Sequence, residues 1–465
     1  MKYLYGASVQ GIQDFIFKTN KLQEIVGASE IVKSVAGEFE KISGYKEGDK
    51  NILINAAGNI KAIFGSREEC QKVVLEFGKI IQQKAHGITL SQAVIEIGDN
   101  YTQNDIDELE KNLKTQRNKP SILLDMSINI MKLNPKTAKP AIKEDKENIV
   151  DKATEQKLQA NQEFYKQNPS VKEYKNFSYL KNTKGKLAVI HIDGNGLGKI
   201  IKALGEKLST FSIALDRATH RAVENSKSDS MHIREVIIGG DDVTVISNAN
   251  DALEFTKNFL QNFEDETSKI EELQGISDKL TACAGIAYCN EKYPFHYAVD
   301  LAETLCGVAK NHSERKSSSL MFHNIQSSNF QSWDIFVEDE LTIRNDKEVI
   351  RCDFGPYYLN EPNQPLISDF LHTVGAYASD GSPISRLRAW LGELGKSDQY
   401  AKDMLKRINK MAQQSSDWNS CIMEKNLKNL DRELSNETLI IGEKGKRKTP
   451  IYDVLQILSV TEAKK

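Results

Sequence analysis

The sequence has neither a CxxC pair nor a long hydrophobic run. Its six cysteines are scattered, which argues against a zinc ribbon and fits reduced thiols in a cytosolic protein. No run of about 18 consecutive apolar residues occurs, and the N-terminal MKYLYGASVQGIQDF lacks the apolar core of a signal peptide. We therefore expect a soluble, cytoplasmic protein with no membrane partner.

An excess of charge of one sign is also missing. Lysine and arginine total 62 against 65 acidic residues, so the formal net charge is -3. This balance gives no global electrostatic argument for binding nucleic acid, and any basic surface must be local. The chain does have length, because 465 residues with 39% hydrophobic content can form about two to four domains with cores of their own.

Residues 1–110 alternate strand-like and helix-like runs in the order strand, helix, strand, strand, helix, strand. This βαββαβ order is typical of an antiparallel sheet covered by helices on one face. The predicted strands are 2–9, 52–55, 60–64 and 91–97, and the predicted helices are 13–39 and 67–83. Residues 111–184 then turn polar and rich in lysine, and we interpret them as a connector without an obvious core, helical over 154–165.

Residues 185–325 repeat the first pattern, and residues 326–465 break it. In the repeat, strands are predicted at 187–192, at 279–288 and on both sides of Gly239-Gly240-Asp241-Asp242, and helices at 200–208, 251–263 and 297–310. Helical runs at 386–394 and 400–411 predict a small, mostly helical C-terminal domain, with 433–465 as a tail. The chain is thus predicted to be an α+β protein.

The two βαββαβ halves align as an internal repeat. LYGASVQGIQDFI lies over VIHIDGNGLGKII, and NILINAAGNIKAIF lies over REVIIGGDDVTVIS. Ser8 then takes the place of Asp193, and Gly58-Asn59 takes that of Asp241-Asp242. The first copy keeps the shape without the three carboxylates, so the carboxylates of the second copy are not needed for folding.

EVIIGGDDVTVIS predicts a β-hairpin whose turn presents two adjacent carboxylates. Taken alone it is also an ordinary turn, because Gly and Asp are common turn residues. Metal-dependent nucleotide chemistry needs two or three carboxylates from separate strands, since Mg²⁺ prefers hard oxygen ligands. If the strand that ends at Asp193 lies beside the hairpin, then Asp193, Asp241 and Asp242 meet at one edge. They are the candidate catalytic residues and metal ligands.

The loop after Asp193 is rich in glycine and runs into a predicted helix. Free amides and the dipole at a helix N-terminus favour a triphosphate. It is not a Walker loop, because Ile200 rather than Ser or Thr follows its lysine. The candidate nucleotide-binding residues of the loop are Gly194, Asn195, Gly196, Gly198 and Lys199.

HIDGNGLGKII, VIIGGDDVTVI and the N-terminal GASVQGIQDFIFKTNKLQEIVGAS resemble the palm domains of the large polymerase-like subunit of type III CRISPR effector complexes. They are similar, more distantly, to the GGDEF nucleotide cyclases. In the CRISPR family two palm domains pack face to face, two ATP molecules bind between them, and the GGDD palm makes cyclic oligoadenylate, which activates defence nucleases. The resemblance therefore implies two ferredoxin-like (βαββαβ) palms, the first degenerate and the second catalytic, plus a small C-terminal helical domain.

The resemblance also implies roles for single residues. The three aspartates would hold Mg²⁺ or Mn²⁺, and Gly239 and Gly240 would border the nucleotide. Lys310 is similar to the lysine that meets the triphosphate in GGDEF-type enzymes, with a surface lysine at a helix end as the alternative. Ser8 and Ser29 would touch the second nucleotide, with a structural role in a helix or turn as the alternative.

Two features of the family are missing. None of the eight histidines is followed by Asp, so the HD nuclease motif is absent and we expect no DNase activity. The connector contains no cysteine, so the family's four-cysteine zinc module is absent as well. These losses favour a stand-alone or divergent defence protein. A guide-RNA complex, an activator RNA and a second copy of the chain are the partners to test.

The leading hypothesis is a Mg²⁺- or Mn²⁺-dependent nucleotidyltransferase that uses ATP, releases pyrophosphate and makes a cyclic oligoadenylate in antiviral defence. One alternative is a stand-alone cyclase that makes a cyclic mono- or dinucleotide. Another is a scaffold subunit that binds nucleotide without turnover. Three carboxylates beside a basic, Gly-rich loop argue against the scaffold, since acidic groups are costly to hold together without a cation.

Overall fold

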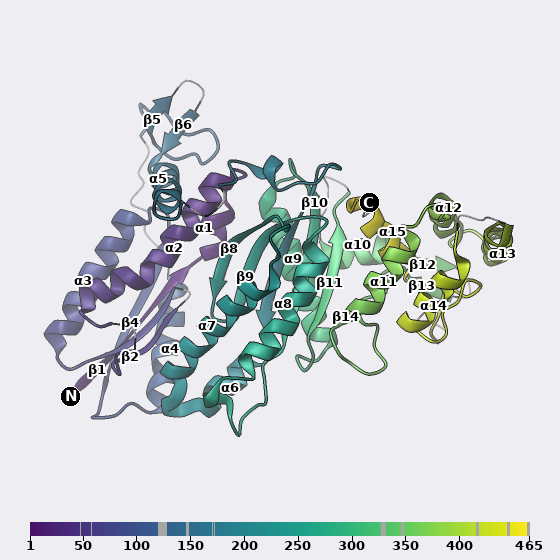
Figure 1. Ribbon diagram of the computed structural model, residues 1–465. Helices are drawn as coiled ribbons and strands as arrows, with labels where there is room; N and C mark the ends of the chain where they lie inside the picture. Colours follow the sequence, from purple (N-terminus) through teal and green to yellow (C-terminus); the bar gives the residue numbers. More distant parts are fainter. Residues whose placement is uncertain are drawn as a thin grey trace.

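The computed structural model describes residues 1–46, 48–56, 58–119, 128–145, 148–169, 171, 173–326, 332–345, 348–414, 418–443 and 447–462. Ala57, in the first copy of the hairpin turn, lies outside these residues, as does part of the connector. The described chain is α+β, as predicted, and two palms and a C-terminal helical region follow one another along it (Figure 1). None of the described helices is long and apolar enough to cross a membrane.

The first palm is a four-stranded antiparallel sheet in the order β2-β3-β1-β4. Its strands are β1 (Lys2–Gln10), β2 (Ile52–Ala56), β3 (Asn59–Phe64) and β4 (Thr89–Ile97). Because side chains alternate along a strand, Tyr5, Ala7 and Val9 share one face. They belong to the same core as residues of α2 (Leu22–Ser43) and α3 (Arg67–Lys84). The predicted strands and the second predicted helix are confirmed.

The helix predicted over 13–39 is instead two helices. A short break separates α1 (Ile12–Phe17) from α2. Within it the Thr19 hydroxyl accepts a hydrogen bond of 3.1 Å from the amide two residues on, a local bond that competes with helix continuation. The Asn20 side chain accepts a bond of 2.8 Å from the Phe295 N–H, so the break ties the first palm to the second.

The expectation that helices cover only one face of this sheet is wrong. Helix α4 (Gln103–Arg117) covers the opposite face. Its apolar side chains recur at helical spacing and form a separate buried cluster with strand residues, comprising Ile106, Leu109, Leu113, Leu4, Leu53, Ile95 and Ile97. The first sheet is therefore buried on both sides.

The connector includes the hairpin β5 (Ala141–Asp145) and β6 (Asn148–Asp151) followed by α5 (Lys152–Gln167), which confirms the predicted helix. Helix α5 packs tightly on α2. A Cβ on Gly27 would lie only 1.7 Å from the backbone oxygen of Lys157. This part of the connector is thus integrated into the first palm rather than separate from it, while its hairpin projects beyond the helices in Figure 1.

The second palm repeats the strand order of the first, as β10-β7-β9-β8. Its strands are β7 (Lys186–Gly194), β8 (Ile233–Gly239), β9 (Asp242–Asn248) and β10 (Ala282–Asn290), and β11 (Ser319–Asn324) and β14 (Tyr357–Tyr358) extend the sheet beyond β10. Its helices are α6 (Leu197–Leu204), α7 (Leu208–Ser226), α8 (Ala252–Thr267) and α9 (Phe295–His312). The helix predicted over 200–208 therefore ends early, at Gly205, whose φ is +53°.

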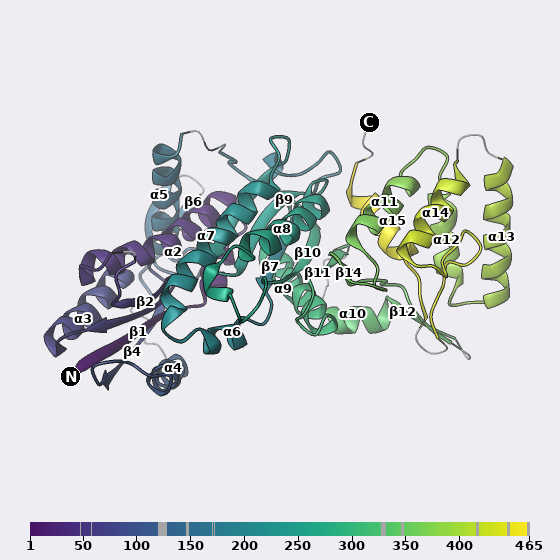
Figure 2. The same cartoon turned by 60° about the horizontal axis from the view of Figure 1, so that its bottom comes forward.

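The C-terminal region is mostly helical, as predicted. It comprises α10 (Trp333–Asp339), α11 (Ile367–Tyr377), α12 (Ile384–Glu393), α13 (Asp398–Gln414), α14 (Ser420–Leu430), α15 (Ile451–Val460) and the short strands β12 (Thr342–Asn345), β13 (Glu348–Arg351) and β15 (Arg447–Lys448). These helices lie on the side of the second palm away from the first (Figure 2). The expected tail at 433–465 is wrong, because α15 is buried and its Gln456 side chain accepts a bond of 2.8 Å from the Asn324 N–H.

The two palms meet in a reciprocal way. Helix α2 of the first palm lies against β8 of the second, and α7 of the second lies against β2 of the first. The Ser29 hydroxyl in α2 donates to the Val236 carbonyl, and the Ser209 hydroxyl in α7 donates to the Ile52 carbonyl at 2.7 Å. The internal repeat is thus also an approximate two-fold arrangement in space.

Candidate active site

Strand pairing brings the predicted carboxylates to one edge of the second sheet. Asp193, near the end of β7, is the direct partner of Asp242 at the start of β9. Asp241 lies in the turn, close enough to Asp193 for the neighbouring carboxylate to raise its pKa. The expectation that the β7 strand lies beside the hairpin is confirmed.

Gly194 allows this close approach. Its N–H donates to the Asp241 carbonyl at 3.2 Å, and a Cβ at Gly194 would lie 2.7 Å from the Asp241 Cβ. A side chain at this position would require the neighbouring atoms to move. The structure therefore gives Gly194 a packing role beside the role in nucleotide binding that the sequence predicted.

The carboxylates at this edge are held in an unfavourable electrostatic environment. Burial, reinforced by neighbouring Asp193, raises the pKa of Asp241 to about 6 and that of Asp242 to about 7. The Oδ1 atom of Asp242 is buried and has no hydrogen-bond partner in the described part of the chain. A nearby divalent cation would relieve both effects, because it favours the charged form and accepts oxygen ligands.

The side chain of Lys310 brings a positive charge to this edge. Its ammonium group forms an ion pair with Asp193 and donates to the Gly194 carbonyl at 2.8 Å. The residue is 5% exposed, which excludes the alternative of a surface lysine. In this arrangement no three Asp, Glu, His or Cys side chains of the described residues form a ready metal centre. Mg²⁺ is usually held by one or two carboxylates with substrate phosphates, so the donor set still fits it.

His191 is a neighbour that the sequence reasoning missed. Its Nδ1 lies 3.2 Å from the Thr244 hydroxyl and 3.5 Å from Asp242 Oδ1. Burial lowers the pKa of His191 to about 4, so the ring is neutral at physiological pH. The signal in the sequence was its spacing, since a residue two before Asp193 on a strand shares its face.

The glycine-rich loop is fixed mainly through Asn195. The Asn195 side chain is buried and donates to the Thr281 hydroxyl at 3.0 Å and the Ser317 carbonyl at 3.3 Å. Gly196 takes a left-handed conformation, with φ +73°, as the residue before α6. Gly198 and Lys199 are exposed in the first turn of that helix. The structure thus places Asn195 in the frame of the loop and leaves Gly198 and Lys199 open to a ligand.

Helix α7 holds the hairpin turn. Gly240 has a left-handed φ of +62°, and its N–H donates to Asp216 Oδ1 at 3.3 Å. Its carbonyl accepts a bond of 2.5 Å from the Thr219 hydroxyl, while Gly239 pairs with Asp242 across the hairpin. Asp216 and Thr219 were not singled out from the sequence, because no local motif marks a helix residue that contacts a distant turn.

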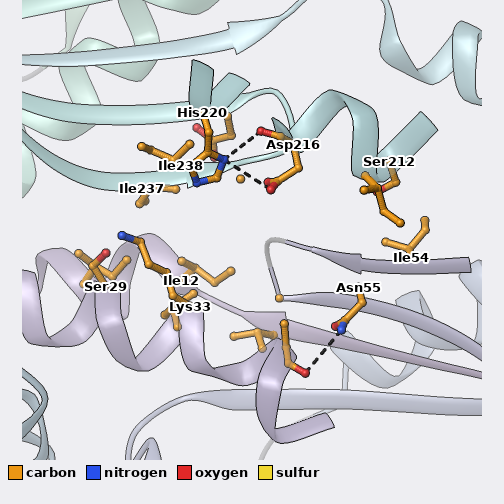
Figure 3. A pocket seen from close by; sticks show the side chains of 18 of the residues that line it. Ile12, Ser29, Lys33, Ile54, Asn55, Ser212, Asp216, His220, Ile237 and Ile238 are labelled. Atoms are coloured by element: carbon orange, nitrogen blue, oxygen red, sulfur yellow. Dashed lines mark hydrogen bonds and ion pairs between the residues drawn. The ribbon is translucent and has the colours of Figure 1, made fainter. Parts of the chain in front are cut away.

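A cavity of about 710 Å³ lies between the two palms, and Asp242 and Gly239 form part of its wall. Figure 3 shows Asp216 and His220 on the side of the second palm and Ser29, Lys33 and Asn55 on the side of the first. The volume is in the range of small-molecule sites, which is about 300–1,000 Å³. Ser29 thus combines the structural role of bonding the Val236 carbonyl with a position on the cavity wall.

The corresponding edge of the first palm has the same backbone and different chemistry. Ser8 pairs with Asn59 between β1 and β3, as Asp193 pairs with Asp242 in the second palm. The buried Ser8 hydroxyl donates to Asn59 Oδ1 at 2.8 Å and accepts from the Arg117 guanidinium at 3.0 Å. Neutral groups therefore occupy positions that are acidic in the second copy.

Residues 186–319 match the family model for the second palm domain of Cas10/Cmr2. This confirms the resemblance seen in the sequence: residues 186–319 are similar to the second palm domain of Cas10/Cmr2. No curated protein matches the sequence.

Solved structures resemble nearly the whole chain. A Csm1-Csm4 cassette in complex with cA3 is 14% identical with a TM-score of 0.54, covering 99% of this chain and 70% of that one. The cassette in complex with pppApApA is 14% identical with a TM-score of 0.54, covering 99% of this chain and 69% of that one. Csm1 in T. onnurineus is 15% identical with a TM-score of 0.51, covering 99% of this chain and 70% of that one. At this identity the likeness shows the shared fold.

Proposed function

We propose that this chain, with its Cas10/Cmr2-type second palm domain, is a metal-dependent nucleotidyltransferase that joins ATP into a cyclic oligoadenylate. One observation carries the proposal. Three carboxylates meet at a sheet edge whose Asp242 also lines a 710 Å³ cavity between two palms. The related Csm1-Csm4 structures contain cA3 and pppApApA, which are a product and an intermediate of that chemistry.

Asp193, Asp241 and Asp242 are the residues that would hold Mg²⁺ or Mn²⁺. When bound, such an ion activates a 3′-hydroxyl and neutralises the leaving pyrophosphate. The 3′-oxygen of one nucleotide then forms a bond to the α-phosphorus of another, the bond from that phosphorus to pyrophosphate breaks, and the hydroxyl proton passes to solvent.

The chain's own residues bind and orient the phosphates. Lys310 is held beside Asp193 by the Gly194 carbonyl, and its ammonium group would contact a phosphate oxygen of a bound nucleotide. Lys199, exposed in the first turn of α6, would add a second contact for a triphosphate at the N-terminus of that helix. Because both palms line the cavity, two nucleotides can face one another across it.

A nucleotide-binding scaffold without turnover is the second candidate. The ion pair between Asp193 and Lys310 favours it, because this pair neutralises one of the three carboxylates without a metal. Both candidates are compatible with a type III CRISPR complex or an activator RNA as partner, and the product distinguishes them.

The test is incubation with labelled ATP and Mg²⁺ or Mn²⁺, with and without RNA, followed by product chromatography. Changing Asp241→Ala together with Asp242→Ala should abolish pyrophosphate release, whereas Asp265→Ala, on the exposed side of α8, should not. Equal release by the double variant, with its fold intact by circular dichroism, would refute catalysis at this edge. ATP binding with no product under any condition would favour the scaffold.

A further inference from the structure

We propose that Asp216 and His220 select the nucleobase in the cavity, and that they recognise a base by an exocyclic amino group such as the N6 amine of adenine. The inference deepens the proposed function and rests on it, because it concerns how that site chooses its substrate. It starts from the position of the pair on the cavity wall.

Both residues lie on α7 one helical turn apart and face the cavity (Figure 3). Their side chains remain 36% exposed for Asp216 and 50% exposed for His220, although the helix lies between two packed domains. They are thus open to a ligand in the cavity. The same wall includes Gly239 and Asp242, so a base held there lies next to the candidate catalytic edge.

The hydrogen bonds of the pair define what it can offer to a ligand. His220 Nδ1 lies 2.9 Å from the Asp216 backbone oxygen, which can only accept, so Nδ1 carries the proton. In the neutral ring Nε2 is then an acceptor. Asp216 Oδ1 accepts from the Gly240 N–H at 3.3 Å, and its Oδ2 lies 3.4 Å from His220 Nδ1, so lone pairs on both oxygens remain for a ligand. The pair therefore presents two neighbouring acceptors.

The rest of the cavity is compatible with a purine. Its walls carry apolar side chains from both palms that suit a planar base, among them Ile12, Ile54, Ile237 and Ile238 (Figure 3). Polar groups on the opposite wall have partners in part, and the Asn55 Oδ1 atom is buried without a hydrogen-bond partner among the described residues. Lys33 Nζ lies 3.2 Å from Glu30 Oε1, and Asn55 Nδ2 donates to Glu40 Oε1 at 3.1 Å.

Two acceptors side by side complement a group with two N–H donors. The amino group of adenine carries two N–H donors on one nitrogen, so each donor can bond one of the two acceptors. A base that lacks the amine leaves the acceptors unpaired, and a site built to bond a polar group discriminates strongly against an analogue without it. Asp216 also bonds Gly240, so base recognition is connected directly to the GGDD turn.

The experiment measures binding rather than turnover. The α,β-methylene analogues of ATP and of purine riboside triphosphate, which has hydrogen in place of the amine, are titrated into the full-length protein with Mg²⁺ by calorimetry. The wild type should prefer the ATP analogue by about tenfold or more, as expected for one to two lost hydrogen bonds.

Asp216→Asn and His220→Ala should weaken the ATP analogue and leave the purine analogue nearly unchanged, so that the preference falls to about threefold or less. His220→Gln, which restores an oxygen acceptor, should recover part of the preference for the ATP analogue. Asp265→Asn is the matched control and should keep the wild-type preference. His220→Ala gives the decisive result if Asp216→Asn lowers the melting temperature, because His220 is half exposed.

The inference would be overturned if Asp216→Asn and His220→Ala kept the wild-type preference for the ATP analogue and lost pyrophosphate release. In that case the pair would act only on the hairpin turn. The proposed function would survive that result. If no variant, including the wild type, releases pyrophosphate while the preference still depends on Asp216 and His220, the proposed function fails and base selection by the pair is supported.

Discussion

A single methyl group at Gly194 should disturb the candidate active site without removing any polar atom. The added Cβ would lie 2.6 Å from Leu197 Cδ1, 2.7 Å from the Asp241 Cβ and 2.9 Å from Asp241 Oδ2. Carbon atoms in contact prefer about 3.5–4.0 Å, so the turn that carries Asp241 must move by about 1 Å. Gly194→Ala therefore tests whether the position of this carboxylate matters.

The expected effects on stability and activity differ in size. Overpacking of this kind costs about 1–3 kcal/mol, which lowers the melting temperature by a few degrees. A displacement of about 1 Å at a reacting centre can cost about 100-fold in rate. We expect Gly194→Ala to stay folded and to lose about 100-fold in pyrophosphate release.

The assay is pyrophosphate release from ATP at saturating Mn²⁺, with thermal unfolding of the same samples. Gly375→Ala in α11 is the control, because a Cβ there meets nothing within 4 Å and alanine stabilises a helix by about 1 kcal/mol relative to glycine. Wild-type activity in Gly194→Ala would refute the reasoning that the close approach of the loop and the turn sets the carboxylate geometry.

Two further predictions concern stability. The pKa values of about 6 for Asp241 and about 7 for Asp242 lie above the ordinary 3.8, so the unfolded chain releases these protons at lower pH than the folded one. The free energy of unfolding of the metal-free protein should therefore fall as pH rises from about 4 to 7, and Asp241→Asn with Asp242→Asn should flatten that fall in urea titrations. Ser209→Ala should lower the free energy of unfolding by about 1 kcal/mol, because it leaves the Ile52 carbonyl without its partner. Ser268→Ala, whose hydroxyl bonds the Asp265 carbonyl on an exposed surface, should change it little, and equal effects of the two substitutions would contradict the reciprocal contact.

The sequence alone determined the strands, most of the helices and the repeat. These follow from local rules, since side-chain periodicity and turn chemistry act over neighbouring residues. The alignment of Ser8 with Asp193 was correct because it rested on equivalent strands, and both residues pair with the equivalent residue of the hairpin. The second-palm assignment followed from the same motifs.

Tertiary structure decided everything that depends on distant contacts. Lys310 is buried by elements far from it in the chain. The Gly240 N–H bonds Asp216, and the Arg117 guanidinium bonds Ser8, across similarly long separations. No local sequence pattern encodes these contacts. The sequence predicts a tail at α15 because the core partners of this helix lie in other elements. The cavity needs both palms, since its shape exists only after α2 and α7 have each packed on a strand of the other palm.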